Sequence, residues 1–421
     1  MPFPEERRPG AGRAWIQLNM DHLRHNVSVL RNRLPPGCRL MPVVKADAYG
    51  HGAVLIAGEL NRLGIHAFCV ATAGEGAELR EYGIQGDILI LGYTPPEDTA
   101  LLVRYDLIQT IVDYQYAQAL DKLGLPFRVH VGIDTGMHRL GQRCEEPDRI
   151  CAIFSMKNLA VEGIFTHLCA DNTTSPEDRS LTLAQADAFH QVVNQLRRRG
   201  IACPATHLLS SYGLLQYPAL GGSYARVGIA LYGVLESSGD AARFGADLRP
   251  VLSVHTRIAL TKPLHPGEYA GYGRAFLAKQ EMKIAALSMG YADGLPRALS
   301  CGVGSVLIHG RRAPILGRIC MDQTLVDVSA IPEAAPGDTV TVLGSSGALS
   351  ISACDIAASC GTIANEILSR LGPRLERRAV GTAASTPCPL WLFRCKTRPH
   401  SPFSPSAPAS LPAHFFACRP P

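Results

Sequence analysis

The sequence lacks long apolar runs, a signal peptide and any close spacing of metal-ligating cysteines. No stretch approaches the roughly eighteen apolar residues of a membrane span, and the opening MPFPEERRPGAGRA has no apolar core. The thirteen cysteines match no metal-ligand pattern, so we expect reduced thiols and no metal site. These absences predict a cytoplasmic protein with no membrane segment in this chain.

The chain also has little net charge outside its last residues. Four of its five net positive charges lie after Ala379, where no acidic residue occurs, so we do not expect nucleic-acid binding. Nine prolines occur among the last 36 residues, without helical or strand periodicity. We therefore expect a disordered tail over residues 381–421 and a disordered N-terminus over residues 1–13.

Apolar, β-branched segments recur through the first half of the chain and alternate with segments of helical spacing, such as residues 21–34 and 181–200. The apolar segments cover residues 42–45, 66–72, 87–93, 107–113, 127–134, 161–167, 206–211 and 225–234. Near-continuous apolar strands that alternate with helices are typical of parallel sheets covered on the outside. They predict an α/β fold, a TIM-like (β/α)8 barrel over about residues 21–247.

The pattern changes after Pro250 to strands without long helices between them. Turn signals such as HPGE and APGD separate these strands. We predict a mainly β domain over residues 248–380, and we expect the first strand, residues 14–20, to join it. We assign residues 14–247 to the barrel domain, although their first strand is expected to pair with the β domain.

The stretch VVKADAYGHG places Lys45 directly after the first apolar segment. In a barrel, polar residues at the carboxyl ends of strands face the active site. A lysine partly removed from water holds its proton less tightly and can form a Schiff base with an aldehyde cofactor. Position alone also allows a surface lysine, and Tyr49 with its neighbouring glycines could form an ordinary loop.

Other predicted strand ends carry polar side chains as well. Arg226 lies in the last predicted strand, and Gly228 lies where the backbone can approach a phosphate. Taken singly, a buried arginine is usually an ion-pair partner, and a histidine is usually a core residue. The further strand-end residues are Asp134, Arg139, His167, Ser210 and Ser211.

Together these motifs resemble the fold-type III pyridoxal-phosphate racemases, specifically the alanine racemase family. VVKADAYGHG is similar to the family's cofactor-lysine motif. The likeness continues from Ala14 to Val380 through DTGMHRLG, FTH, RVGIALYG, GYGRAF, GYADG and GRICMDQ. The resemblance implies pyridoxal 5'-phosphate as the cofactor, an amino acid as the substrate, and a homodimer.

By this resemblance Lys45 carries the cofactor and serves as the base on one face of the substrate α-carbon. Tyr272, in GYGRAF, matches the base for the opposite face, because racemisation removes a proton from one side and returns it on the other. A phenol is a poor base at neutral pH unless positive charge favours its anion, which His167 and Arg226 would provide. Arg226 also matches the residue facing the ring nitrogen, where it would weaken the electron sink and favour reprotonation over decarboxylation.

The resemblance also implies the remaining contacts. Arg139 matches the residue near the ring hydroxyl and the substrate carboxylate, and Met321 matches a backbone contact to that carboxylate. In the family, Tyr272 and Met321 reach the partner's barrel, so each site would be shared between two chains. The phosphate site would consist of Tyr49, Ser211, Gly228 and Ile229.

Two positions depart from the family pattern. Gly132 stands where many members have a lysine that can be carbamylated, so Arg139 must be oriented by another group. Asn365, in GTIANEILSRLG, stands where alanine racemases typically have a tyrosine near the phosphate and the substrate side chain. The smaller amide leaves room and a hydrogen-bond partner for a hydroxymethyl group.

With these features the chain resembles the racemase half of the membrane-bound serine racemases of vancomycin resistance. We predict a racemase that interconverts L- and D-serine and L- and D-alanine by a two-base mechanism and supplies cell-wall precursors. The membrane half is absent here, so the chain is a free-standing relative or a fragment.

Three alternative hypotheses of function remain open from the sequence. A housekeeping alanine racemase would have little serine activity. A non-catalytic pyridoxal-phosphate-binding barrel would lack the second domain with Tyr272. A fold-type III decarboxylase would be expected to place a carboxylate where this chain has Arg226.

Overall fold

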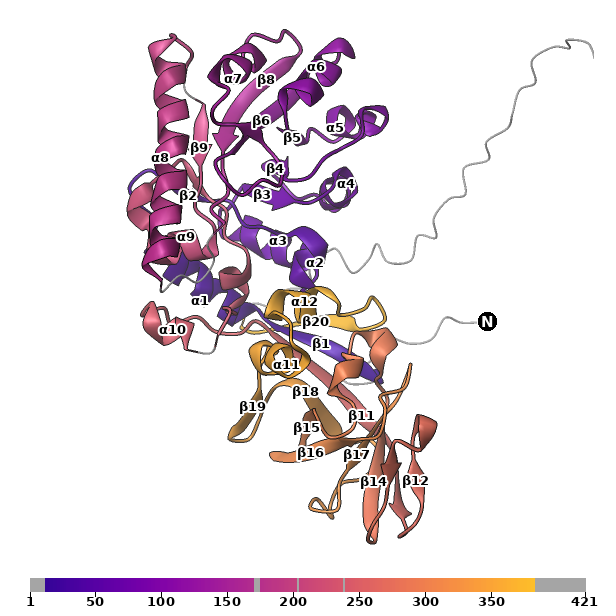
Figure 1. The fold of residues 1–421 in the computed structure, drawn as a ribbon. Coiled ribbons are helices and arrows are strands. Elements are labelled where there is room, and N and C mark those ends of the chain that lie inside the picture. Colours follow the sequence, from indigo (N-terminus) through magenta and orange to yellow (C-terminus); the bar gives the residue numbers. More distant parts are fainter. Residues whose placement is uncertain (1–11, 170–174, 203, 238, 383–421) are drawn as a thin grey trace, which may run out of the picture. The chain divides into compact units, whose positions relative to one another are not determined.

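The computed structural model describes residues 12–169, 175–202, 204–237 and 239–382 (Figure 1). Most of the two segments predicted to be disordered, residues 1–11 and 383–421, lies outside the described residues. The residues at their edges make hydrogen bonds. Arg13 donates to the Asp293 carboxylate, and Thr382 donates to the Asp21 carboxylate through its amide at 2.9 Å.

Eight parallel strands of the described chain close into a ring (Figure 1). Six of them form one sheet in the order β3, β4, β5, β6, β8, β9. Parallel bridges from Val43 to Cys69 and from Leu209 to Ala225 join this sheet to the β2 and β10 pair. The strands are β2 (Arg39–Leu40), β3 (Ala67–Val70), β4 (Asp87–Ile90), β5 (Ile108–Ile111), β6 (Phe127–Asp134), β8 (Leu159–Phe165), β9 (Ala205–His207) and β10 (Tyr224–Ala225). The barrel prediction is confirmed.

Several helices of the barrel start at capping residues that their sequences provide. Asn19, Thr72 and Ser175 accept hydrogen bonds from amides in the first turns of α1, α4 and α8. No helix of the described residues has both the length and the apolar character needed to cross a bilayer. The helices are α1 (Met20–Arg31), α3 (Ala53–Arg62), α4 (Ala73–Glu81), α5 (Ala100–Arg104), α6 (Tyr114–Lys122), α7 (Pro147–Ile153), α8 (Pro176–Arg198), α9 (Ser211–Gln216) and α10 (Asp240–Arg243).

The eighth strand is shorter than predicted. Residues 225–234 were expected to be extended, but β10 ends at Ala225 and Ile229–Tyr232 form a short 3-10 helix, η3. The Ser211 hydroxyl stabilises this conformation, because it accepts hydrogen bonds from the amides of Gly228 and Ala230. These amides are therefore turned away from a strand ladder.

The second region is mainly β, as predicted. β1 lies between β11, to which it is antiparallel, and β20, to which it is parallel. An added pairing of β18 with β11 closes six strands into a ring. The sheet runs in the order β19 (Leu349–Ile351), β18 (Thr339–Ser346), β15 (Ser305–Ile308), β16 (Arg311–Leu316), β17 (Thr324–Asp327), β14 (Met282–Leu287), β11 (Leu252–Leu264), β1 (Ala14–Asn19), β20 (Glu376–Val380). The division between residues 247 and 248 stays a prediction.

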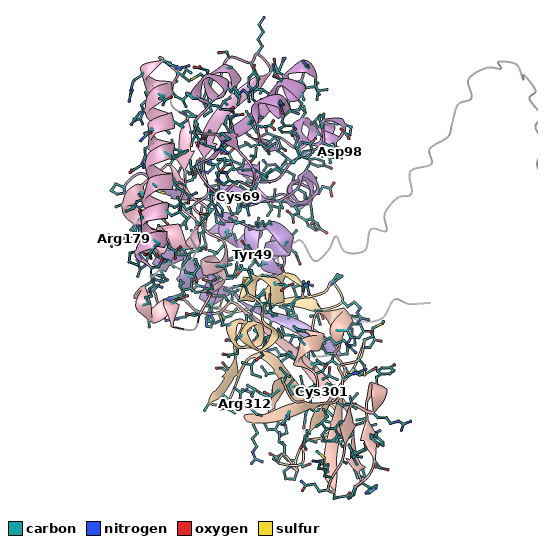
Figure 2. The ribbon with its side chains drawn as sticks, in the orientation of Figure 1. Tyr49, Cys69, Asp98, Arg179, Cys301 and Arg312 are labelled. Carbon is teal, nitrogen blue, oxygen red and sulfur yellow. The ribbon has the colours of Figure 1, made fainter. Side chains whose placement is uncertain are left out.

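Smaller elements complete the β region. β12 (Tyr269–Ala270) and β13 (Phe276–Leu277) form a hairpin around the 3-10 turn η4 (Tyr272–Arg274). Two helices, α11 (Ala353–Cys360) and α12 (Ala364–Ser369), precede β20. One cluster of buried apolar side chains includes Phe68 of the barrel and Val306 of the β region. Figure 2 shows Cys69, which is fully buried, among the barrel strands.

The barrel interior holds a buried pair of histidines. His130 on β6 and His207 on β9 are both buried, and His130 Nδ1 lies 2.9 Å from His207 Nε2. Burial lowers the pKa of His130 to about 4 and the pKa of His207 well below its usual range. Both rings are therefore neutral in the folded protein at neutral pH.

We expect the free energy of unfolding to fall as the pH drops from about 6.5 toward about 4. In that window the unfolded chain binds protons at these positions while the folded chain does not, so acid favours unfolding. Each such histidine should lower the free energy of unfolding by about 1 kcal/mol at pH 5.5 relative to pH 7.5. Urea unfolding at three pH values measures this dependence. His130→Gln should reduce the dependence by the share of one histidine, and an unchanged slope would contradict the assignment.

Candidate active site

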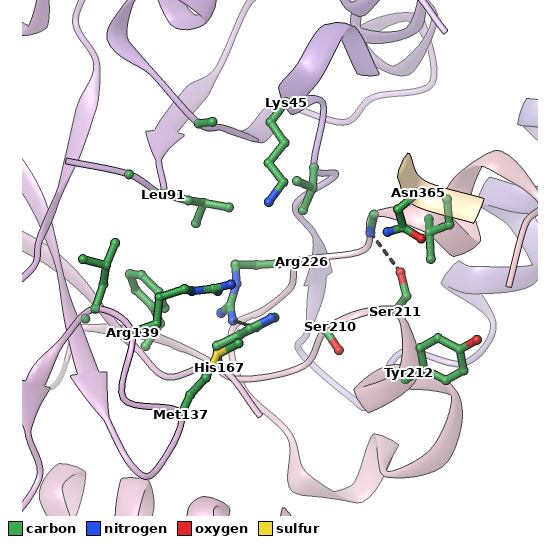
Figure 3. Close-up of a pocket in the computed structure, with 18 of the residues that line it drawn as sticks. Lys45, Leu91, Met137, Arg139, His167, Ser210, Ser211, Tyr212, Arg226 and Asn365 are labelled. Carbon is green, nitrogen blue, oxygen red and sulfur yellow. Dashed lines mark hydrogen bonds between the residues drawn. The ribbon is translucent and has the colours of Figure 1, made fainter. Parts of the chain in front are cut away.

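A cavity of about 360 Å³ lies at the carboxyl ends of the barrel strands (Figure 3). Parallel strands in a closed barrel bring their carboxyl ends to one face, so residues far apart in the sequence meet there. Nine of the eleven residues that were predicted to react or to bind cofactor or substrate line this cavity. They are Lys45, Tyr49, Arg139, His167, Ser211, Arg226, Gly228, Ile229 and Asn365.

Lys45 begins a short turn, α2 (Lys45–Tyr49), just after the bridge that Val43 makes with Cys69. The next residues, Ala46, Asp47 and Ala48, have φ of 52° to 54°, in the left-handed region. This conformation costs roughly 1–2 kcal/mol per residue, so the surroundings must hold it. Burial, with the Arg139 charge adding to it, lowers the pKa of the Lys45 amine below its usual range.

Arg226 is buried and is held by neutral acceptors. Its guanidinium donates to His207 Nδ1 at 2.7 Å, to the Thr166 carbonyl at 2.7 Å and to His167 Nδ1 at 3.4 Å. Burial lowers the pKa of Arg226 to about 10, so the group remains cationic at neutral pH. Among the described residues no carboxylate pairs with it. The cavity therefore contains a fixed positive charge without a protein counter-ion.

The proton positions on the two histidines follow from this arrangement. An arginine has no acceptor, so each ring accepts at Nδ1 and carries its proton on Nε2. Burial lowers the pKa of His167 to about 3, with the charges of Arg226, Arg139 and Lys45 adding to the effect. His167 is thus a neutral ring beside a cation.

A small cradle of polar groups lies at one end of the cavity. Ser211 Oγ accepts from the amides of Gly228 at 3.0 Å and Ala230 at 3.3 Å. A Cβ at Gly228 would lie 2.6 Å from Tyr49 Oη, so a side chain there would displace the phenol. Burial raises the pKa of Tyr49 to about 12 and keeps it a neutral donor. A hydroxyl and a neutral phenol that can both donate suit a phosphate.

The charges of the cavity fit a phosphorylated aldehyde. Lys45 supplies an amine that burial favours in its neutral, nucleophilic form, and Arg226 supplies a donor for a ring nitrogen. Arg139 is exposed and forms no ion pair within the described residues. Gly132, at the cavity wall, offers it no side chain.

Asn365 reaches the same cavity from α12 of the β region. Figure 3 shows it close to Ser211, across from Arg226. Its side chain is half-buried, and within the described chain its amide makes no hydrogen bond. The amide is therefore available to a ligand.

Two predicted residues, Tyr272 and Met321, do not line this cavity. Both lie on the β region and are exposed, with 70% and 53% of their surface accessible. The backbone around Met321 is fixed, because the amides of Tyr291 and Ala292 donate to the carbonyls of Cys320 and Met321, each at 3.0 Å. A single chain thus presents these side chains away from its own cavity.

Some residues that shape the cavity received no role from the sequence. His207 lies in a predicted strand. A histidine among the apolar residues of such a strand indicates a polar contact inside the barrel. Asp47 lies within the Lys45 turn, where it pairs with Arg377, and Glu75 contacts the turn at Ala46. Their only signals in the sequence are a position after the lysine and a helix-capping pattern. Arg377 comes from the distant strand β20, and no local pattern identifies it.

Family models match almost all of the described chain. The model described as alanine racemase, N-terminal domain, matches residues 18–236, and the model described as alanine racemase, C-terminal domain, matches residues 251–379. An alanine racemase structure from Clostridium difficile 630 has a TM-score of 0.82 and 32% identity, covering 88% of this chain and 96% of that one. Both parts of the fold are therefore those of this family.

Two curated relatives from Enterococcus are longer than this chain. An amino-acid racemase from Enterococcus faecalis is 42% identical over 87% of this chain and 52% of its own length. A serine/alanine racemase from Enterococcus gallinarum is 36% identical over 89% of this chain and 53% of its own length. The chain thus spans about half the length of these relatives. The chain belongs to the alanine racemase family, whose enzymes use pyridoxal phosphate.

Proposed function

We propose that the chain is an amino-acid racemase that interconverts L- and D-alanine and L- and D-serine. The observation that carries this proposal is one cavity in which the partly buried Lys45 amine, the buried Arg226 cation and the Ser211 cradle occur together. The relatives named amino-acid racemase and serine/alanine racemase support it.

Pyridoxal phosphate would be held by Lys45, Tyr49, the Ser211 cradle with Gly228 and Ile229, and Arg226. When bound, this cofactor supplies an electron sink that makes the α-proton of an amino acid acidic. Arg226 can only donate, so a nitrogen facing it stays unprotonated and the sink stays weak. His167, neutral and next to Arg226, orients that guanidinium. A weak sink favours return of the proton over other reactions.

Lys45 would take or give the proton on one face of the substrate. Because burial lowers the pKa of its amine, Nζ reaches the neutral, proton-accepting form more easily than an exposed lysine. Arg139, which forms no ion pair among the described residues, would bind the substrate carboxylate, with the Met321 backbone as a further donor.

The proton on the opposite face would be held by Tyr272 of a second copy of the chain. The exposure of Tyr272 and Met321, and their absence from the cavity lining, support a homodimer in which each β region completes its partner's site. A protomer alone would then have one base and could not racemise.

Mixing two inactive variants tests this arrangement. Lys45→Ala and Tyr272→Phe should each lose nearly all activity, whereas dimers reassembled from both should contain one site with both bases. Random pairing in a two-fold dimer should restore about a quarter of the wild-type rate. Racemisation of L-alanine with added pyridoxal phosphate is the assay. A mixture as inactive as its components would argue against shared sites.

Asn365 would set the acceptance of serine. Its amide lines the cavity and has no hydrogen-bond partner in the described part of the chain. A hydroxymethyl substrate could therefore bind an amide that the fold leaves open. Sites that hydrogen-bond a substrate hydroxyl discriminate more strongly than apolar pockets do.

We expect Asn365→Tyr to lower kcat/KM for L-serine roughly tenfold or more relative to L-alanine, as loss of one hydrogen bond and of space requires. Asn365→Leu, which keeps the size but not the amide, is the matched control. Loss in both variants assigns the effect to the hydrogen bond, and loss only in the tyrosine variant assigns it to space. If only alanine turns over and the ratio is unchanged in both variants, the chain is an alanine racemase with little serine activity, the second candidate.

We further propose that the enzyme works in the cytoplasm and supplies D-amino acids for cell-wall precursors, with a role in vancomycin resistance. The name serine/alanine racemase of the Enterococcus gallinarum relative supports only the supply of D-amino acids.

A further inference from the structure

The turn after Lys45 places four successive residues other than glycine in the left-handed region. Their φ values are 52° at Ala46, 53° at Asp47, 54° at Ala48 and 53° at Tyr49. L residues normally visit this region singly, because Cβ crowds the following carbonyl. A run of four persists only when neighbouring groups hold it. Those neighbours therefore decide where the Lys45 side chain begins.

Glu75 of α4 holds the start of the turn from the barrel side. Its Oε1 accepts from the Ala46 amide at 2.7 Å, directly after Lys45. Its Oε2 accepts from the amides of Ala71 at 2.6 Å and Thr72 at 3.3 Å. One carboxylate thus ties the residue after Lys45 to the fixed N-terminus of α4.

Arg377 of β20 holds the other end of the turn. One nitrogen pairs with the Asp47 carboxylate at 3.2 Å, and Nε donates to the Gly50 carbonyl at 3.3 Å. Its remaining hydrogens go to carbonyls of its own region, those of Leu371, Gly372 and Leu375. Only 12% of the side chain is exposed. A planar guanidinium fixed in this way transmits the position of the β region to the turn.

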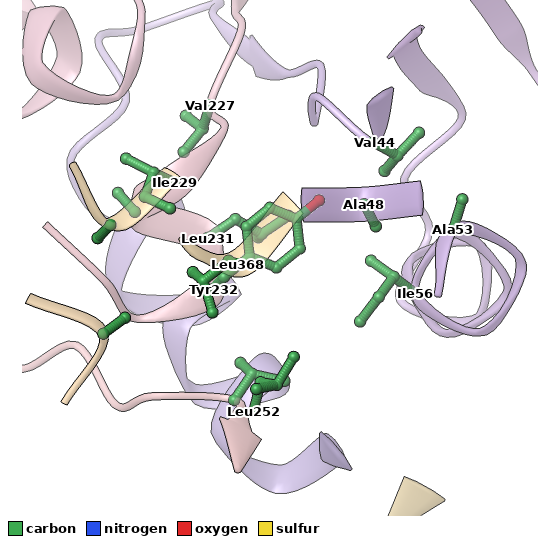
Figure 4. Packing of buried hydrophobic residues seen from close by; sticks show 14 of the residues in the cluster. Val44, Ala48, Ala53, Ile56, Val227, Ile229, Leu231, Tyr232, Leu252 and Leu368 are labelled. Atoms are coloured by element: carbon green, nitrogen blue, oxygen red, sulfur yellow. The ribbon is translucent and has the colours of Figure 1, made fainter. Parts of the chain in front are cut away.

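The inner side of the turn has no room to relax. Ala48 is fully buried, and Figure 4 shows it near Val44 and Ile56. A Cβ at Gly50 would lie 2.1 Å from the Leu368 carbonyl of α12. Any relaxation must therefore go outward, against Glu75 and Arg377.

We propose that Arg377 and Glu75 are positioning residues that hold the Lys45 turn in its left-handed form and so fix where the Lys45 amine enters the cavity. Neither touches a reacting atom. The role rests on the proposed function of Lys45 and adds to it a contribution that the β region makes within the same chain.

Hydrogen exchange of the peptide 45–52 tests the holding of the turn. Arg377→Met should raise exchange there about tenfold while a barrel-core peptide around residues 108–111 stays unchanged. Asp47→Asn keeps the oxygen that accepts from the Ala53 amide but loses the charge facing Arg377, so it should give a smaller increase. Both variants together separate the ion pair from the carbonyl contacts of Arg377.

The control is Arg378→Met, on the neighbouring position of the same strand. That guanidinium pairs with Glu376 at 2.7 Å and lies over the Trp15 ring at 5.0 Å, with no contact to the turn in the described residues. It should leave exchange at residues 45–52 unchanged. Equal effects from Arg377→Met and Arg378→Met would overturn the proposal, because a loosened strand would then explain both.

A chemical readout addresses the lysine itself. Pyridoxal phosphate alone, followed by borohydride, should label Lys45, and mass spectrometry should locate the label. Arg377→Met should slow this labelling and lower kcat roughly 10- to 100-fold with a smaller change in KM, as a displaced reacting group does. Arg377→Lys should rescue only partly, since an ammonium cannot reach Asp47, Gly50 and three further carbonyls.

The same treatment of Glu75 completes the test. Glu75→Gln keeps only one of the two oxygens that accept backbone amides and should give an intermediate effect, whereas Glu75→Ala should behave like Arg377→Met. Unchanged exchange and labelling in both Arg377→Met and Glu75→Ala would refute the role. If the wild type neither labels at Lys45 nor racemises, the proposed function fails instead, and exchange at residues 45–52 still decides whether the turn is held.

Discussion

The burial of the Arg226 charge constrains the histidines that surround it. A guanidinium with no carboxylate partner in the described chain must be satisfied by neutral acceptors, here two histidine rings and backbone carbonyls. Because arginine only donates, those rings must present a bare Nδ1, and their proton positions are set. The positive field also keeps His167 neutral. A substrate or cofactor that brings negative charge therefore enters a site already arranged to balance it.

The two regions of the fold contribute different things to this site. The barrel supplies the charged groups, because its strand ends converge there. The β region supplies a wall, through Asn365 on α12, and an outer contact to the Lys45 turn, through Arg377 on β20. The chemistry thus depends on how closely the two regions are held together. The two regions touch where Gly50 approaches the Leu368 carbonyl, and this approach leaves no room for a Cβ at Gly50.

Much of this arrangement was predictable from the sequence, and the reasons for the rest are physical. Strand-end residues such as Lys45 and His167 could be identified because apolar strands and their last residues are local patterns. The turn into η3 was not predicted, since it depends on a Ser211 hydroxyl that withdraws two amides from a strand. The left-handed turn after Lys45 was also not predicted, because ADAY contains no glycine that would indicate positive φ values. Contacts across hundreds of positions, such as Arg377 with Asp47, leave no local signal at all.

The pairing of β1 with β20 has a consequence for the order in which the molecule can mature. These strands are hydrogen-bonded neighbours, from Trp15 opposite Glu376 to Asn19 opposite Val380, although almost the whole described chain lies between them. A growing polypeptide exposes its first strand early, and that strand must wait for its last partner to be synthesised. Arg377 lies on that late partner. A nascent barrel can therefore collapse around its own core well before its lysine turn receives its final contact, and the positioning proposed for this amine would be completed only when β20 is in place.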